Sequence, residues 1–163
     1  MLDVIVALIA LSSGPADNTA APDVASAPAE AAPAAPALVA EPQVATGQFT
    51  TALEVRPILG ATRNNWVAVR EFDGQDLVYV THLWAWRCGL ARIEFSVNGA
   101  PLQDWPMPDC HLGTAMPNAV TADDGLPYQT FPLGSVGSVS VRITYDDLGV
   151  EEAQWQRAQV LMP

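Results

Sequence analysis

The chain has 163 residues and a net charge of −11, from 18 acidic and 7 basic residues, and every basic residue is an arginine. The lack of lysine excludes a P-loop, a Schiff-base enzyme, an S-x-x-K nucleophile pair and a protein-kinase site. The acidic balance argues against binding to nucleic acid or to an anionic membrane surface, because both need a basic patch.

Residues 1–13 are typical of a signal peptide. Val4 to Leu11 is an apolar run of eight residues, too short to span a bilayer, and small residues around Ser12 suit cleavage there. No positive charge precedes the run, and Asp3 stands in its place, so three readings stay open: a start upstream, a weak or uncleaved signal, or an ordinary apolar N-terminus. We expect export to a periplasmic or extracellular location, with no membrane-spanning segment in the mature chain.

Residues 14–46 have the composition of a linker. These 33 residues include 13 alanines and six prolines, and no aromatic or basic residue. Prolines at this density interrupt helices and favour extended polyproline II, and the segment has little apolar surface to bury. We expect a disordered spacer, with the globular domain at residues 47–163.

The domain has the sequence pattern of an all-β protein. Apolar residues recur with period 2, and turn residues separate the runs. Asp73-Gly74 and Asn98-Gly99 are strong hairpin signals. The last run changes its apolar parity near Gln156 and Arg157, which indicates a β-bulge. The pattern predicts about seven strands and no amphipathic helix. The six clearest runs are at residues 51–57, 66–72, 76–86, 91–99, 138–147 and 151–162.

Alternation within these runs assigns the buried faces. Leu53 and Val55 share one face of the first run. In the two clearest runs, the inward-facing side chains are Ile93, Phe95, Val97, Val139, Val141, Ile143 and Tyr145. Sequential hairpins with one apolar face each predict two antiparallel sheets packed as a sandwich.

Three stretches, "ARIEFSVNGAPL", "SVSVRITYDDLG" and "EEAQWQRAQV", resemble the middle strand and closing hairpin of immunoglobulin-like and fibronectin-III-like domains. The chain also resembles uncharacterised exported bacterial proteins, which implies no particular function. The resemblance implies an antiparallel immunoglobulin-like β-sandwich. The cysteines depart from that family, because Cys88 and Cys110 have only 21 residues between them and would join a local loop instead of the two sheets. In an exported chain, we expect these two cysteines to form a disulfide.

The run from Asp76 to Trp86 is apolar on both faces, so its second face needs a cover. The long segment at residues 100–128 carries Trp105 and five prolines, and a bridge to Cys88 would hold it there. Trp84, Trp86 and Trp105 therefore have two interpretations. They pack under this segment as a satellite core, or they remain exposed as a contact surface.

Metal and catalytic sites are weakly indicated. The four residues of a possible zinc site have poor spacing, since two of them are adjacent: His82, Cys88, Cys110 and His111. The acidic pairs at 123–124 and 146–147 carry calcium-type ligands but match no EF-hand loop and are ordinary turn residues. No nucleophile motif is present. We therefore expect no metal, no cofactor and no catalytic residue.

The sequence favours an exported, tethered, non-catalytic domain that acts by contact, as a protein-interaction or structural accessory domain of the cell envelope. Its partner is then an envelope protein. The alternative is a carbohydrate-binding module, in which exposed tryptophans stack on the sugar rings of a glycan. A small hydrolase or a metal-binding protein is a distant third reading.

Overall fold

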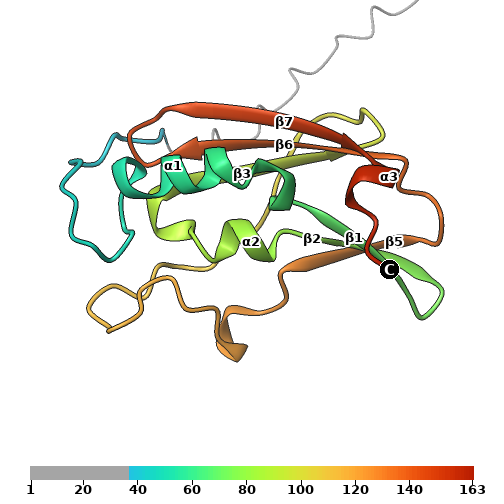
Figure 1. Ribbon diagram of the computed structural model, residues 1–163, viewed down its shortest axis with the longest axis horizontal. Coiled ribbons are helices and arrows are strands. Elements are labelled where there is room, and N and C mark those ends of the chain that lie inside the picture. Colours follow the sequence, from blue (N-terminus) through green and yellow to red (C-terminus); the bar gives the residue numbers. More distant parts are fainter. Residues whose placement is uncertain (1–36) are drawn as a thin grey trace, which may run out of the picture. The chain divides into compact units, whose positions relative to one another are not determined.

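The computed structural model describes residues 37–163 (Figure 1). The apolar segment at 1–13 and residues 14–36 of the expected linker lie outside the described residues. Residues 37–50, ahead of the first helix, have no regular secondary structure.

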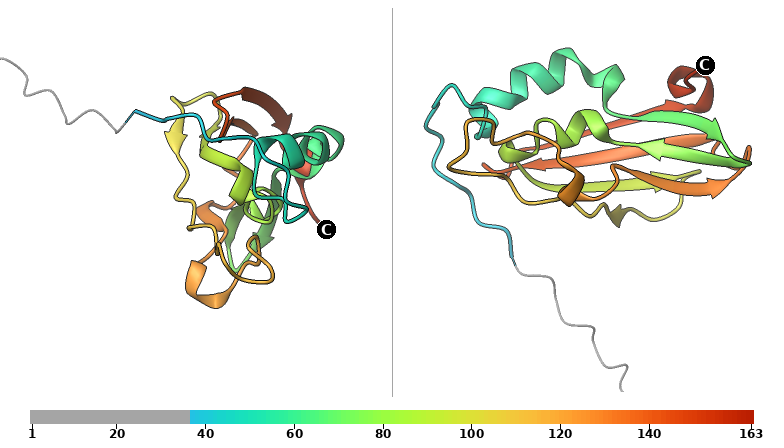
Figure 2. Two further views of the ribbon diagram at one scale, coloured as in Figure 1. Left: turned by 90° about the vertical axis from the view of Figure 1, so that its left-hand side faces the viewer. Right: turned by 90° about the horizontal axis from the view of Figure 1, so that it is seen from below.

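The strands of the described chain form two antiparallel sheets (Figures 1 and 2). One has the strand order β1-β2-β5 and the other β4-β3-β6-β7. The strands are β1 (Ala68–Phe72), β2 (Gln75–Tyr79), β3 (Leu90–Val97), β4 (Gln103–Asp104), β5 (Tyr128–Pro132), β6 (Ser138–Tyr145) and β7 (Val150–Gln156). The prediction of a mostly β, sandwich-like fold is confirmed.

Both predicted hairpin signals form turns. Asp73 and Gly74, between β1 and β2, have φ values of 48° and 73°, and Asn98 and Gly99, after β3, have φ values of 55° and 74°. Positive φ at two successive residues suits a tight antiparallel turn, and Asp-Gly and Asn-Gly adopt it at low cost. The alternation of β6 is also confirmed, because its inward-facing side chains are buried: Val139, Val141, Ile143 and Tyr145.

The expectation of no amphipathic helix is wrong. Residues 51–57, predicted as a strand, instead begin α1 (Ala52–Ala61). The buried side chains of α1 are Ala52, Val55 and Leu59, whose spacing of three and four residues defines one face of a helix. Leu53, which the strand reading placed beside Val55, is 56% exposed.

The start of α1 is stabilised by side chains from other parts of the chain. The carboxylate Oδ1 of Asp146 accepts the N–H of Ala52 at 2.8 Å, and the amide oxygen of Gln43 accepts the N–H of Leu53 at 2.9 Å. The first N–H groups of a helix have no partner within the helix, so such acceptors stabilise it. Because Asp146 is distant in sequence, the local pattern gives no sign of this cap.

Two further strands are shorter than predicted. β2 ends at Tyr79, and α2 (Thr81–Trp84) follows, because helical spacing buries Val80, Leu83 and Trp84 together. The β-bulge predicted near Gln156 and Arg157 is absent. β7 ends at Gln156 and a short helix follows, and this helix accounts for the change in the alternation of apolar residues. The remaining short helices are α3 (Arg157–Val160), η1 (Arg63–Asn65), η2 (Arg87–Gly89) and η3 (Ala122–Asp124).

A buried ion pair joins the two sheets near the start of α3. The Arg157 guanidinium donates to both carboxylate oxygens of Asp76, on β2, at 2.6 and 2.9 Å. Asp76 is fully buried, and the Arg157 hydrogen bonds lower its pKa to about 2. The bidentate geometry offsets part of the cost of burying the carboxylate.

The core is one continuous cluster that takes side chains from both sheets and from α1. Trp66 and Trp155 meet edge to face inside it, with ring centroids 6.1 Å apart. The Trp66 indole N–H donates to the carbonyl of Leu59, which ties α1 to the core. Figure 2 shows α1 lying beside the two sheets.

Gly89 sets how closely α1 approaches η2. A Cβ added to Gly89 would lie 2.5 Å from Val55 Cγ2 and 2.8 Å from the Thr51 carbonyl, whereas one added to Gly60 would meet nothing within 4 Å. We predict that Gly89→Ala lowers the free energy of unfolding by about 1–3 kcal/mol through overpacking. The matched change Gly60→Ala, within α1, should raise it by roughly 0.5–1 kcal/mol. Urea denaturation of both variants tests this, and equal effects would contradict the close packing.

Candidate functional site

The candidate site lies at the end of the domain around the predicted disulfide. The bridge between Cys88 and Cys110 is confirmed, with a Cα–Cα distance of 5.0 Å. It connects η2 to the long segment between β4 and β5. As expected, the bridge joins this segment to the chain just before β3 and does not connect the two sheets.

Arg87, which no sequence motif marks, holds the same segment. Its side chain is buried, and its guanidinium donates four hydrogen bonds of 3.0 Å to backbone carbonyls. The accepting carbonyls belong to Trp84, Asp109, Asn118 and Ala119. Three of these four lie in the segment at 105–127, so one cation fixes that segment at several points.

Asp124 supplies a negative charge beside this guanidinium. Its carboxylate lies 3.6 Å from the Arg87 guanidinium and 3.0 Å from the His111 ring, and its side chain is 5% exposed. The backbone N–H of Thr121, with the His111 and Arg87 side chains, lowers the pKa of Asp124 below its usual range. The carboxylate also completes a capping box with Thr121 at the start of η3.

Asn118 connects the segment to the chain ahead of α1. Its side-chain oxygen accepts the N–H of Cys88 at 3.0 Å, and its side-chain nitrogen donates to the carbonyls of Gln48 and Phe49. We call residues 41–50 the strap. Residues 41–46 belong to the predicted linker, yet Glu41 N–H donates to the Asp146 carbonyl and the Gln43 amide donates to the Asp146 carboxylate, both at 2.8 Å.

Only one of the three candidate contact tryptophans is accessible. Trp84 is 3% exposed and Trp105 is 4% exposed, so both belong to the core and present no face to a ligand. Trp105 packs edge to face on Phe95 at 4.8 Å. Trp86 is half-buried and meets Phe49, on the strap, at 5.4 Å. The three rings therefore do not form a shared exposed platform.

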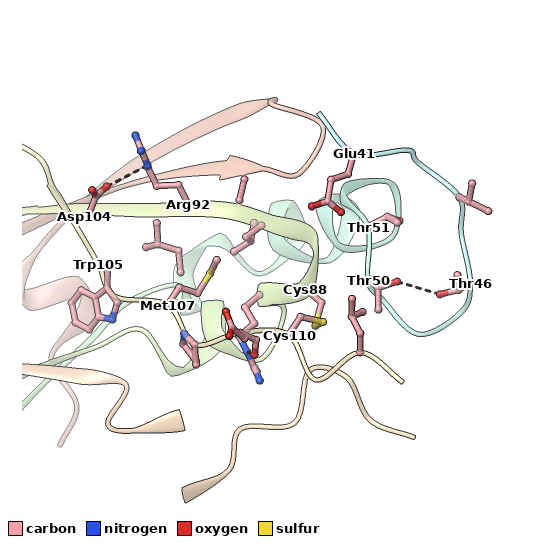
Figure 3. A pocket seen from close by; sticks show the side chains of 18 residues that line it. Glu41, Thr46, Thr50, Thr51, Cys88, Arg92, Asp104, Trp105, Met107 and Cys110 are labelled. Atoms are coloured by element: carbon pink, nitrogen blue, oxygen red, sulfur yellow. Dashed lines mark hydrogen bonds and ion pairs between the residues drawn. A yellow bond between two sulfur atoms is a disulfide. The ribbon is translucent and has the colours of Figure 1, made fainter. Parts of the chain in front are cut away.

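A polar hollow of about 630 Å³ lies on one side of the strap (Figure 3). Strap residues, the start of β3 and residues 104–112 line it, with the buried Trp105 and Ile93 among the lining residues. Figure 3 shows the Arg92–Asp104 ion pair at one margin and Glu41 at the other. Asp109 also lines this hollow, and its carboxylate has no hydrogen bond or ion pair within residues 37–163.

An apolar groove of about 550 Å³ is formed by strap residues 47–49 and by side chains from two other segments. No charged side chain lines it. Its lining includes three exposed apolar side chains, Met116 at 70% and Phe49 and Val120 at 40% each. The remaining lining residues are Gly47, Gln48, Ala85, Trp86, Ala115, Pro117, Asn118 and Ala119.

The side chains considered for metal binding have other partners. Both cysteine sulfurs are in the bridge, His82 is hydrogen-bonded to Thr62 at 2.7 Å, and His111 faces Asp124. Of the two acidic pairs, Asp124 and Asp146 cap helices and Asp147 pairs with Arg56; Asp123, the remaining residue, has no polar partner in residues 37–163. Across the described residues, no three His, Cys, Asp or Glu side chains are grouped to hold a metal ion.

Comparisons of the chain with protein-family models, with curated proteins and with solved structures find no match. Within residues 37–163, no helix is long and apolar enough to cross a membrane. The assignment of a function therefore depends on the geometry of the disulfide end.

His82 gives the domain a pH-dependent stability. Burial lowers the pKa of His82 below its usual value of 6.5, so below that pH the unfolded chain binds a proton that the folded chain does not. The contribution of neutral His82 to the free energy of unfolding is fully present above pH 6.5. It is lost as the pH falls towards the pKa of His82 in the folded state. We predict that His82→Gln stability declines less than wild-type stability between pH 7.5 and 5.5. Parallel declines in urea denaturation would contradict this.

Proposed function

We propose that this chain is an exported, tethered, non-catalytic domain of immunoglobulin-like topology that binds another protein of the cell envelope through the apolar groove. The observation that carries the proposal is the groove itself. It exposes Phe49, Met116 and Val120 together, in a shape that the disulfide and Arg87 hold in place.

The strand order supports the immunoglobulin-like assignment. Immunoglobulin domains place strands A, B and E in one sheet and C, F and G in the other, and some add C′ beside C. The order β1-β2-β5 matches A-B-E, and the order β4-β3-β6-β7 matches C′-C-F-G. The disulfide and the helices depart from that family, because the bridge joins the B–C connection to the segment before strand E.

The disulfide and the composition of the N-terminal part support export. Disulfides persist in oxidising compartments such as the periplasm or the extracellular space. An apolar run followed by a segment rich in alanine and proline suits a signal peptide and then a spacer. In this proposal, the spacer presents the domain away from its point of attachment.

The chemistry of the groove supports a protein partner. The cores of protein interfaces are depleted in charge and enriched in aromatic residues and methionine, and their energetic centres lie in preformed pockets. Phe49 and Trp86 supply aromatic surface, and Met116 supplies a flexible apolar side chain that adapts to a partner. Carbohydrate binding is less well supported, because Trp84 and Trp105 are buried and Trp86 meets the ring of Phe49.

Site-specific photo-crosslinking tests this function. A photoreactive residue replacing the exposed Met116 of the full chain should give one discrete protein adduct in the envelope of producing cells. The control replaces Leu133, which is 55% exposed at the opposite end of β5 and should give no adduct. Excess unlabelled wild-type chain should suppress the adduct, and a Met116→Asp chain should suppress it much less. No adduct, or equal adducts at both positions, would contradict the proposed function.

A further inference from the structure

A second hollow of about 500 Å³ adjoins the apolar groove at Met116. The two share the lining residues Ala115, Met116 and Ala119, so they are neighbours on the segment between β4 and β5. The second hollow is more polar, and His111 and Asp123 are among its lining residues. The aromatic lining at Phe49 and Trp86 and the Asp123 carboxylate thus belong to two adjoining hollows.

The Asp123 carboxylate, which lines the second hollow, remains unpaired among the charged side chains of the described residues. Six of the seven arginines form ion pairs with carboxylates of the described residues, so the positive charge is largely neutralised within the chain: Arg56, Arg63, Arg87, Arg92, Arg142 and Arg157. Asp124 is engaged by Arg87 and His111. Asp123 is exposed and has no hydrogen bond or ion pair within residues 37–163, so it is free to pair with a cation.

Charge also indicates which of three possible ligands fits this surface: a second copy of the chain, its own N-terminal segment, or a segment of another protein. A second copy of this chain carries the same net charge of −11, and like charges oppose close association. Residues 1–40 have acidic side chains and no basic one, so no side chain of that segment is a cation that could pair with Asp123. A segment of another protein with apolar side chains and a lysine or arginine fits both hollows, because its apolar side chains match the groove and its cation matches Asp123.

The backbone of the strap is strained where it meets the groove. Phe49 has a φ of 57°, a left-handed conformation that is uncommon and strained for an aromatic residue. The conformation places its ring against Trp86 and leaves it 40% exposed in the groove. The Asn118 hydrogen bonds to the carbonyls of Gln48 and Phe49 hold this strained turn in position.

We propose that the groove binds a cationic, apolar segment of another protein, whose apolar side chains contact Phe49, Trp86 and Met116 and whose lysine or arginine pairs with Asp123. This inference rests on the proposed function and adds to it the charge and polarity of the partner. Association should be faster at low ionic strength, because salt screens the attraction between the opposite charges of the two proteins. At 0.1 M salt this attraction extends over only about 10 Å.

Fluorescently labelled nonapeptides, titrated into the full oxidised chain and followed by anisotropy, test this inference. The first peptide alternates leucine with serine and arginine. Three counterparts replace its arginines with glutamine, replace them with glutamate, or replace its leucines with serine. We expect the arginine–leucine peptide to bind at least fivefold more tightly than the glutamine form, and the other two forms to bind more weakly still.

Two pairs of variants locate the contacts. Asp123→Asn should weaken binding of the arginine–leucine peptide about two- to fivefold, the effect of one exposed ion pair, whereas Asp73→Asn, at the β1–β2 turn, should not. Met116→Ser should weaken every leucine peptide, whereas Leu133→Ser should weaken none. Equal effects of Asp123→Asn and Asp73→Asn would overturn the cation site and indicate non-specific attraction.

The outcomes separate this inference from the proposed function. If the arginine, glutamine and glutamate peptides bind equally and Met116→Ser weakens all three, the apolar contact stands and the cationic partner is wrong. If the leucine-free peptide binds as well as the others and Met116→Ser has no effect, the groove is not the contact surface and both proposals fail. If no peptide binds at millimolar concentration, the cationic segment is excluded, and the crosslinking result alone decides the proposed function.

Discussion

The disulfide end of the domain depends on one buried cation, the guanidinium of Arg87. Burying such a charge costs several kcal/mol unless it is paired and hydrogen-bonded, and here four carbonyls and the Asp124 carboxylate meet that need. Three of the carbonyls come from the segment at 105–127, so the charge is stable only while that segment is folded over it. The segment in turn supplies Asn118, which positions the strap, and Met116, which lines the groove.

Local patterns in the sequence predicted most of the sheet structure, and long-range contacts account for the errors. The Asp-Gly and Asn-Gly turns and the alternation in β6 are short-range signals, and all are present in the structure. In β3, Ile93 and Phe95 are buried as predicted, whereas Val97 is half-buried and Ser96 is buried. The strand prediction for residues 51–57 is wrong because Val55 shares its buried face with Ala52 and Leu59, at helical spacing. The contacts that stabilise the start of this helix are with Asp146 and Gln43. The end of β7 depends likewise on the pairing of Arg157 with Asp76.

The candidate site was predictable only in part. The spacing of Cys88 and Cys110 indicated a local bridge, and the doubly apolar run before them indicated that something covers it. No spacing rule marks Arg87, because an arginine beside a cysteine is usually a surface residue and its acceptors are backbone carbonyls that carry no sequence signature. The only available clue was the position of a charged residue within the apolar, tryptophan-rich stretch "THLWAWRCGL".

Amide hydrogen exchange in oxidised Arg87→Leu tests most directly whether the segment at 105–127 depends on the Arg87 guanidinium in addition to the covalent bridge. The relevant amides are those of His111 and Ala119, which donate to carbonyls within the segment, and that of Cys88, which donates to Asn118. We expect these amides to lose protection although the bridge is intact, while amides of β3 and β6 remain protected. The dependence on Arg87 would be contradicted if their protection were unchanged in Arg87→Leu and lost only when Cys88 and Cys110 are replaced by serine.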